Sequence, residues 1–273
     1  MAERKTLGDQ QEFVRILWYG DPGTGKTTAS ASLAKLGKIV HIAADPGLKA
    51  RPLTELGVPV NKIEVHDDIR FEALDKLFWD VKEMLAKGGK DAPVGVLWDS
   101  ISEAHKKLLE QTAAKGYEKA KNAGKPRERL SIHLEDYGTN SGEMRYLMRR
   151  FLDLECHVGF AALSKREQDQ NTGYVTYGPD MTPKLAQDLL GYVDLVCKTY
   201  TNTVDGMDEP EYWGLFRAVE GWAAKDRFHA LPPRLINPTF DRVIKYVDGE
   251  LTADTDPDME AARERRRKKD EDK

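Results

Sequence analysis

The sequence predicts an α/β fold in which helices flank a mostly parallel central sheet. Short apolar runs typical of buried strands alternate with helical patterns over about 200 of the 273 residues. A glycine-rich turn joins the first predicted strand to the first helix, and a later apolar strand ends in an aspartate. These features predict one large domain at residues 12–250, between an N-terminal segment at 1–11 and a charged C-terminal tail at 251–273.

The first half of the chain follows this alternation closely. Residues 13–19 (FVRILWY) are apolar, rich in aromatic side chains and followed by a glycine, which favours a buried strand. Residues 71–86 place apolar side chains with a period of about 3.6, so they predict an amphipathic helix that ends at Gly88. In chain order, the elements predicted here are a strand at 13–19, a helix at 26–36, a strand at 38–44, a helix at 71–86, a strand at 94–98 and a helix at 101–114.

The alternation is interrupted after residue 114 and resumes near residue 142. Residues 115–129 hold six basic and two acidic side chains together with two glycines and a proline, and they indicate a mobile basic insertion. After residue 254 the chain is mostly charged, so the tail is predicted to be disordered or a solvated helix. The elements predicted for the second half are a helix at 142–154, a strand at 158–163, a long loop at 165–180, a helix at 183–190 and a strand pair at 192–200 and 212–219.

The net charge and the hydropathy of the chain exclude some classes of binding partner. The 42 basic and 46 acidic residues give a net charge of −4, which excludes histone-like binding of nucleic acid through bulk positive charge but leaves local basic patches. No apolar run reaches the roughly 18 residues that can span a bilayer, so no membrane partner is expected. A polar N-terminus without an apolar leader, and only two cysteines in no metal-ligand spacing, predict a protein of the reducing cytoplasm.

The strongest motif is the segment GDPGTGKT at residues 20–27, which fits the P-loop pattern G-x-x-x-x-G-K-[ST] between a strand and a helix. Its glycines permit the backbone angles that turn successive N–H groups toward an anion. Lys26 is expected to contact the β- and γ-phosphates of ATP, and the Thr27 hydroxyl to bind Mg²⁺. The predicted nucleotide-binding residues are Gly20, Asp21, Pro22, Gly23, Thr24, Gly25, Lys26, Thr27 and Thr28.

Two aspartates at strand ends are candidates for the catalytic carboxylates. Asp99 follows the apolar run 94–98 and is expected to orient the water shell of Mg²⁺, although either Asp99 or Ser100 can instead cap the following helix. Asp45 ends the strand after the P-loop helix and is a candidate for activating water. The alternative for Asp45 is a turn residue in Asp45-Pro46-Gly47.

Three further segments carry a resemblance to a known family: Asp136-Tyr137-Gly138, the run PKLAQDLL at 183–190, and the run AKDRF at 224–228. With the P-loop and the two aspartates, they resemble the RecA-like P-loop NTPase core. Within it, the chain looks like the phage-encoded RecA-like recombination ATPases that assist single-strand annealing, over roughly residues 12–245. The resemblance implies a RecA-like ATPase domain, a homo-oligomeric ring or filament, and the cytoplasm of a bacterial host.

The resemblance also assigns roles to single residues. Asp45 stands where the family usually has a glutamate that activates water, and it is one methylene shorter. Ser164 stands where the family places a polar sensor of the γ-phosphate. Lys225 and Arg227 resemble the Lys-x-Arg finger that a neighbouring subunit inserts toward the γ-phosphate, and the alternative for them is a solvated basic turn.

RecA-like ATPases bind single strands through two loops, which correspond here to residues 115–137 and 165–180. Both segments combine cations with tyrosines, as sequence-tolerant binding of single strands requires, although charge runs in loops are also often merely solvated. Such binding by a chain of net charge −4 is expected to be strongly salt-sensitive. The candidate DNA contacts are Lys121, Lys125, Arg127, Arg129, Lys165 and Arg166.

The function expected from the sequence is a DNA-dependent ATPase that uses ATP and Mg²⁺ on single-stranded DNA in phage recombination or replication, with a single-strand-binding protein as a further partner. Three alternatives remain open at this stage. They are a hexameric DNA helicase motor, a nucleotide-regulated nuclease on branched DNA, and a nucleotide-dependent assembly protein with no DNA role.

Overall fold

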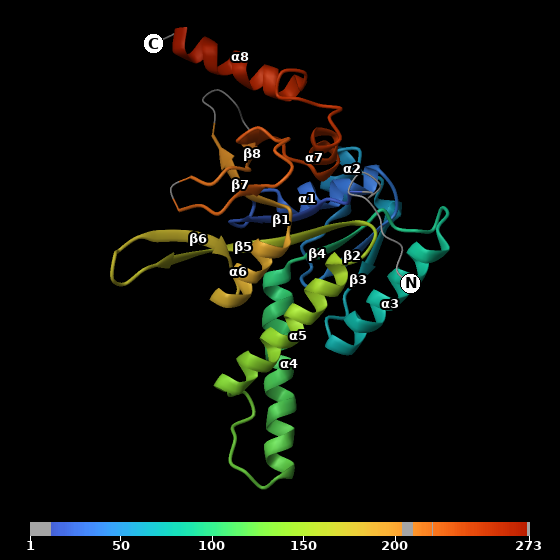
Figure 1. Cartoon of the computed structure of the whole chain (residues 1–273), viewed down its shortest axis with the longest axis vertical. Coiled ribbons are helices and arrows are strands. Elements are labelled where there is room, and N and C mark those ends of the chain that lie inside the picture. Colours follow the sequence, from blue (N-terminus) through green and yellow to red (C-terminus); the bar gives the residue numbers. More distant parts are fainter. Residues whose placement is uncertain (1–11, 204–209, 220, 272–273) are drawn as a thin grey trace, which may run out of the picture.

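The computed structural model describes residues 12–203, 210–219 and 221–271. Its centre is a twisted ten-stranded sheet with helices on both faces, which confirms the predicted α/β fold (Figure 1). In sheet order the path is β10 (Arg234–Ile236), β8 (Glu211–Leu215), β7 (Leu195–Asn202), β1 (Arg15–Gly20), β5 (His157–Gln168), β4 (Gly95–Asp99), β2 (Ile39–Ala43) and β3 (Ile63–His66). Neighbours from β7 to β3 are parallel, whereas β8 pairs antiparallel with both β7 and β10.

Two apolar clusters cover the two faces of this sheet. Successive side chains of β1 alternate between them: Leu17 and Tyr19 belong to one, Ile16 and Trp18 to the other. The first cluster is completed by α3 (Phe71–Lys87), α4 (Ile101–Asn122), α5 (Leu134–Leu152) and α6 (Pro183–Tyr192), and the second by α1 (Lys26–Ala31), α2 (Ala50–Glu55), α7 (Phe240–Val247) and α8 (Pro257–Glu271). Both cysteines are buried, Cys156 in the first cluster and Cys197 in the second.

The register places the functional candidates at one edge of the sheet. Gly20 at the end of β1 pairs with Leu163 of β5 and with Thr199 of β7, and Asp99 at the end of β4 pairs with Ala43 of β2. Because parallel strands end on the same side, the loops that follow β1, β2, β4 and β5 gather there.

The predicted mobile insertion at 115–129 is wrong for its first half, because α4 continues to Asn122. Residues 117–122 (YEKAKN) contain good helix formers, and Gly116 leaves room for the Arg127 side chain, whose Nη1 would lie 2.6 Å from a Cβ at that position. Residues 115–137, which include the end of α4 and the start of α5, are called the arm below. In Figure 1 the lower ends of α4 and α5 protrude from the body of the sheet.

The predicted loop at 165–180 is a β-hairpin in the structure. The second half of β5 pairs antiparallel with β6 (Val175–Pro179), from Ser164 opposite Pro179 to Gln168 opposite Val175. The turn is closed by Asp169, whose side chain accepts hydrogen bonds from the backbone N–H groups of Asn171 and Thr172 at 2.9 and 2.8 Å. The β-branched and aromatic residues at 174–177 explain the strand. This hairpin projects to the left in Figure 1.

The helix predicted at 142–154 is α5, which begins eight residues earlier, at Leu134, and ends at Leu152. The predicted strand at 192–200 begins at Leu195, because Tyr192 ends α6, and the predicted strand at 212–219 ends at Leu215. The elements that the sequence patterns missed are short: α2, the edge strand β3, β9 (Lys225–Asp226), β10 and α7. In the described ranges, no helix combines the length and apolar composition needed to cross a bilayer.

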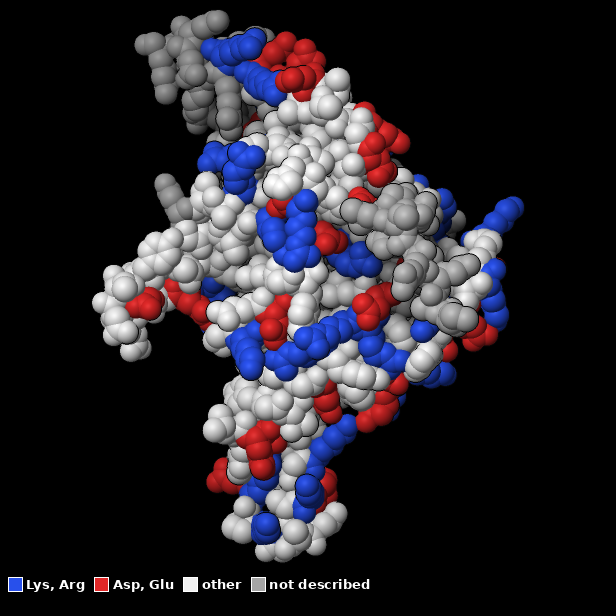
Figure 2. All heavy atoms as spheres, viewed as in Figure 1, with Lys and Arg blue, Asp and Glu red and all other residues white. Residues whose placement is uncertain are grey.

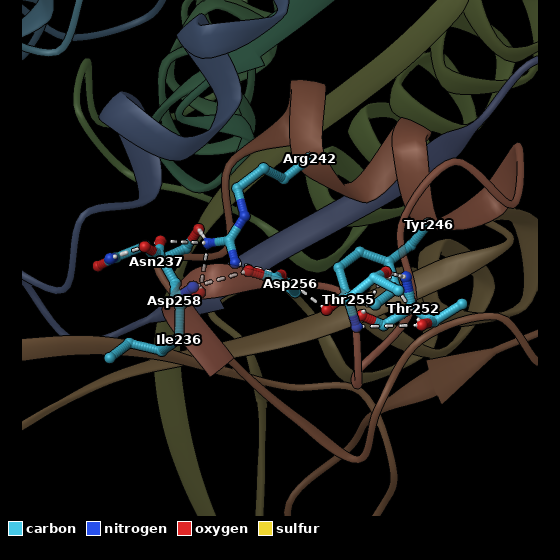
Figure 3. A network of polar contacts seen from close by, with 8 residues as sticks. All are labelled: Ile236, Asn237, Arg242, Tyr246, Thr252, Thr255, Asp256 and Asp258. Atoms are coloured by element: carbon cyan, nitrogen blue, oxygen red, sulfur yellow. Dashed lines mark hydrogen bonds and ion pairs between the residues drawn. The ribbon is translucent and has the colours of Figure 1, made fainter. Parts of the chain in front are cut away.

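The start of the charged tail is anchored to the body of the protein (Figure 3). The buried carboxylate of Asp256 accepts a hydrogen bond from the Tyr246 hydroxyl at 2.7 Å and forms an ion pair with Arg242, both on α7. Arg242 also donates to the carbonyls of Ile236 and Asn237 at 2.7 Å each. These contacts order the first turns of α8, where Met259 and Ala262 are buried.

Candidate functional site

The P-loop lies between β1 and α1 and has the backbone of an anion cradle. Gly23 and Gly25 adopt φ angles of 80° and 81°, a region that disfavours other residues. A Cβ on Gly20 would lie 2.3 Å from Thr199 Oγ1, so this position also excludes a side chain. The three glycines therefore permit a turn whose backbone can approach a phosphate closely.

Lys26 fills this turn from within. Its Nζ donates hydrogen bonds to the carbonyls of Gly20 at 3.0 Å and Asp21 at 2.8 Å, and only 8% of the residue is exposed. Burial lowers the pKa of Lys26, and the nearby Asp99 carboxylate opposes that shift. The Thr24 hydroxyl donates to the Asp21 carbonyl at 2.8 Å and contacts the Thr199 hydroxyl. An ammonium group held by loop carbonyls can transfer its hydrogen bonds to phosphate oxygens in the same turn.

Asp99 faces the P-loop threonine. Burial raises the pKa of Asp99 to about 6, and the neighbouring Thr27 hydroxyl opposes that shift. The helix cap, in contrast, is provided by Ser100, whose Oγ accepts the backbone N–H of Glu103 at 3.2 Å. The two roles left open by the sequence therefore fall on two different residues, and Asp99 is left facing the cradle.

The donor set at Thr27 and Asp99 fits Mg²⁺. In the ranges that the structure describes, no three His, Cys, Asp or Glu side chains are grouped to hold a metal ion. Mg²⁺, however, typically uses one or two protein oxygens together with waters and substrate phosphates. One hydroxyl and one carboxylate oxygen beside a phosphate cradle match that requirement.

Asp45 and Ser164 flank the same edge. The Asp45 side chain accepts the backbone N–H of Gly47 at 2.8 Å, as the turn interpretation requires. Its charge also raises the pKa of Asp99, so the two carboxylates are electrostatically coupled. Ser164 lies one residue beyond Leu163, the partner of Gly20, and is half-buried at the base of the hairpin. Both residues thus lie at the edge of the sheet where a group that positions water or contacts the γ-phosphate is expected.

Lys225 and Arg227 lie beside the start of β7, away from the P-loop of the same chain. Lys225 donates a hydrogen bond to the Leu190 carbonyl, and Arg227 forms an ion pair with Asp194 at 3.3 Å and donates to the Gly191 carbonyl at 2.8 Å. In the described parts of the chain, no hydrogen bond or ion pair joins either residue to residues 20–27. The Arg227 side chain is 52% exposed, so it is presented at the surface.

The candidate DNA contacts separate into two groups. Lys121, Lys125, Arg129 and Arg166 are exposed, and Lys165 is half-buried next to Glu167, with 3.0 Å between Nζ and Oε1. Arg127 differs: its side chain is only 4% exposed and forms an ion pair with buried Asp136. Arg127 is therefore held by partners within the arm, and the DNA contacts proposed below do not include it. On the face shown in Figure 2, acidic side chains are interspersed with the basic ones along the arm.

Two residues at the P-loop were not expected from the sequence. Lys198 on β7 is buried, and its Nζ lies 3.8 Å from Asp21 Oδ2. The ring of Tyr212 on β8 lies 3.1 Å from the position that a Cβ on Gly25 would take. A lysine inside the apolar run LVCKTY was the available signal for Lys198. Tyr212 gave none, because its position depends on strand pairing across the sheet.

Comparison with known proteins agrees with this geometry. The family model described as AAA domain matches residues 12–228, which include the P-loop, Asp45, Asp99, Ser164 and the Lys225–Arg227 segment. No curated protein matches the chain.

Proposed function

The chain belongs to the AAA domain family and carries an AAA-type P-loop ATPase domain, and on that premise we propose that it hydrolyses ATP with Mg²⁺ while acting on single-stranded DNA as a homo-oligomer. The observation that supports hydrolysis best is the buried Asp99 carboxylate next to the Thr27 hydroxyl and the buried ammonium of Lys26, which donates to two P-loop carbonyls. The RecA-like, phage-type setting in recombination or replication, with a single-strand-binding protein as partner, is part of this proposal.

Different residues of the site bind the phosphates, hold Mg²⁺ and position the attacking water. The backbone of residues 20–25 and the Lys26 ammonium bind and orient the phosphates, which lowers the barrier mainly by positioning and by electrostatic stabilisation. Thr27 and Asp99 would hold Mg²⁺, which neutralises charge on the β- and γ-phosphates when it is bound. Asp45 is the candidate for orienting the attacking water, and Ser164 for contacting the γ-phosphate.

Single-strand binding is assigned to cations of the arm and the hairpin that are exposed or half-buried. Lys121, Lys125 and Arg129 lie along the arm, and Lys165 and Arg166 lie on β5 where it forms the hairpin. Exposed tyrosines accompany both groups, Tyr137 on the arm at 40% and Tyr174 on the hairpin at 57%. Cations that track phosphates and aromatic rings that stack on bases are the two components of sequence-tolerant binding.

The oligomer is proposed because the Arg227 side chain is exposed and, among the described residues, makes no hydrogen bond or ion pair with its own P-loop. If Arg227 acts on the active site of a neighbouring subunit, Arg227→Ala should bind ATP and lose on the order of 10³-fold in hydrolysis. Mixing Arg227→Ala subunits with Lys26→Ala subunits should restore part of the activity, because some interfaces then combine an intact P-loop with an intact finger. No recovery in oligomers shown to be mixed rejects a role in trans.

The decisive experiment compares the ATPase rate with Mg²⁺ in the presence and absence of single-stranded DNA. We expect hydrolysis that requires Mg²⁺ and is stimulated by single strands more than by duplex. A rate that no DNA changes would favour an assembly protein and reject DNA dependence. Separate assays for strand displacement and for nicking of branched DNA test the helicase and nuclease alternatives, and we expect neither activity.

A further inference from the structure

Lys198 is a buried cation beside the P-loop whose ammonium has few partners. Its side chain is 4% exposed, and its register partner on β1 is Tyr19, the residue before the P-loop. Lys198 Nζ lies 3.8 Å from Asp21 Oδ2, which is an ion pair too long for a hydrogen bond. In the described part of the chain no hydrogen bond from this ammonium is present, although it carries three donors.

This arrangement is costly unless a second anion approaches. Placing a charged group in the interior requires paired charges and hydrogen bonds in compensation. Burial lowers the pKa of Lys198, and Asp21 compensates only in part because 68% of its own side chain is exposed to water. Lys26 Nζ donates to the Asp21 carbonyl at 2.8 Å and Lys198 Nζ lies 3.8 Å from Asp21 Oδ2, so both ammonium groups face the same small region of the loop. Two cations close together favour an anion between or beside them.

Lys198 is also connected to the β5–β6 hairpin through aromatic rings. Its Nζ lies 4.2 Å from the centre of the Trp222 ring, and that ring stacks on Tyr177 of β6, with centroids 3.8 Å apart and planes 9° apart. Backbone hydrogen bonds fix the stack, because Tyr177 donates to the Gly221 carbonyl at 2.9 Å. The Tyr19 hydroxyl donates to the Ala223 carbonyl at 2.6 Å, which joins the same segment to β1.

We propose that Lys198 is a nucleotide-sensing residue that exchanges Asp21 for a phosphate of the bound nucleotide, and in doing so couples the P-loop to the hairpin through Trp222 and Tyr177. The ammonium moves relative to the indole when phosphate binds, and the stack transmits that change to β6. Lys198 thus acts as a positioning residue, because it holds the phosphate on one side and, through Trp222, the hairpin on the other. The inference rests on the proposed function only in that it requires nucleotide to bind at the P-loop.

The test uses ADP as the probe and two readouts on the full chain: calorimetric affinity and tryptophan fluorescence. Wild type should bind ADP with a change in fluorescence, and Trp222→Phe should bind ADP while losing most of that change. Lys198→Met should bind ADP on the order of 10-fold more weakly, as expected for a lost charge-assisted hydrogen bond, and should lack the Trp222 signal. The matched control is Lys38→Met, a one-third-exposed lysine 3.2 Å from Glu64 at the opposite end of the sheet, and it should behave as wild type.

Asp21→Asn keeps the test decisive if Lys198→Met does not fold, because Asp21 is exposed. Freed from its carboxylate partner, Lys198 should bind phosphate more readily, so ADP affinity should rise and the Trp222 signal should persist. Unchanged affinity and an unchanged signal in Lys198→Met, or weaker ADP binding in Asp21→Asn, overturns the inference alone. Absence of ADP binding in wild type overturns the proposed function instead.

Discussion

Buried cations lie both at the P-loop and in the arm, and their charges are compensated differently. In the arm, the Arg127 guanidinium is surrounded by acceptors: the carboxylates of Asp136 and Glu135 and the carbonyls of Ala113 and Ser131. At the P-loop, Lys26 is held by two backbone carbonyls, and Lys198 lies 3.8 Å from the Asp21 carboxylate and against the Trp222 ring. A buried cation with fixed carboxylate partners stabilises its own fold, whereas one that lacks them is prepared for an anion that arrives later.

The largest effect expected from this comparison is on the arm. Arg127→Ala should lower the free energy of unfolding by about 3–5 kcal/mol, because it leaves Asp136 buried without its partner. Chemical denaturation measures the difference. The control Arg129→Ala, at an exposed position in the same segment, should stay within about 0.5 kcal/mol of wild type. Equal effects for the two arginines would contradict the structural role of Arg127.

The corresponding change at the P-loop should act on activity and leave the fold intact. Lys26→Ala is expected to reduce ATP hydrolysis by about 10²- to 10³-fold, since it removes a preorganised cation from the phosphate site. Its unfolding free energy should fall far less than that of Arg127→Ala. ATPase assays and denaturation of the same preparations measure both quantities. A folded variant with wild-type turnover would contradict the assignment of the P-loop.

Asp99 sharpens the comparison because its carboxylate is destabilising in the folded chain without metal. Its pKa is raised to about 6 from about 4 in the unfolded chain, so the folded state binds more protons between these values and loses stability as the pH rises through them. Asp99→Asn should therefore stabilise the nucleotide-free protein at pH 7.5, by up to about 3 kcal/mol, and have little effect near pH 4. The same variant should lose Mg²⁺-dependent hydrolysis.

Denaturation at both pH values checks the stability part. An equal stability difference at pH 4 and pH 7.5 would show that the carboxylate charge is not its origin. Hydrolysis at the wild-type rate would remove Asp99 from the metal site.

The smallest expected effect concerns the exposed cations of the arm. Lys125→Ala combined with Arg129→Ala should reduce the slope of log affinity against log salt by about 1.4 for single-stranded DNA, at roughly 0.7 for each phosphate contact. Binding titrations across a salt series measure this slope. The fold should be unaffected, since neither side chain is buried. An unchanged slope would show that these two side chains do not contact the phosphates of DNA.

Sequence reasoning succeeded where chemistry is local. The P-loop, its strand and Asp99 follow from short contiguous patterns, because one turn and one strand end determine their geometry. The fate of Arg127 could not be predicted, since it depends on α4 continuing past residue 114 and on Asp136 lying within reach. The polar residues at 165–180 predict a loop, and the pairing of β5 with β6 beyond Leu163 overrides that local pattern. The position of Lys198 beside the P-loop could not be predicted either, because its neighbours come from β1 and from the segment around Trp222.

Because both cysteines are buried, the protein should react very slowly with thiol reagents. Cys156 and Cys197 are at most 1% exposed, and burial raises the pKa of Cys156 to about 12, so neither presents a reactive thiolate near neutral pH. A cysteine introduced at exposed Asn171, in the turn of the hairpin, would then be the single fast-reacting site for a maleimide dye. Neither native cysteine therefore has to be replaced before labelling. A fluorophore on that turn can report hairpin motion without any change to the core.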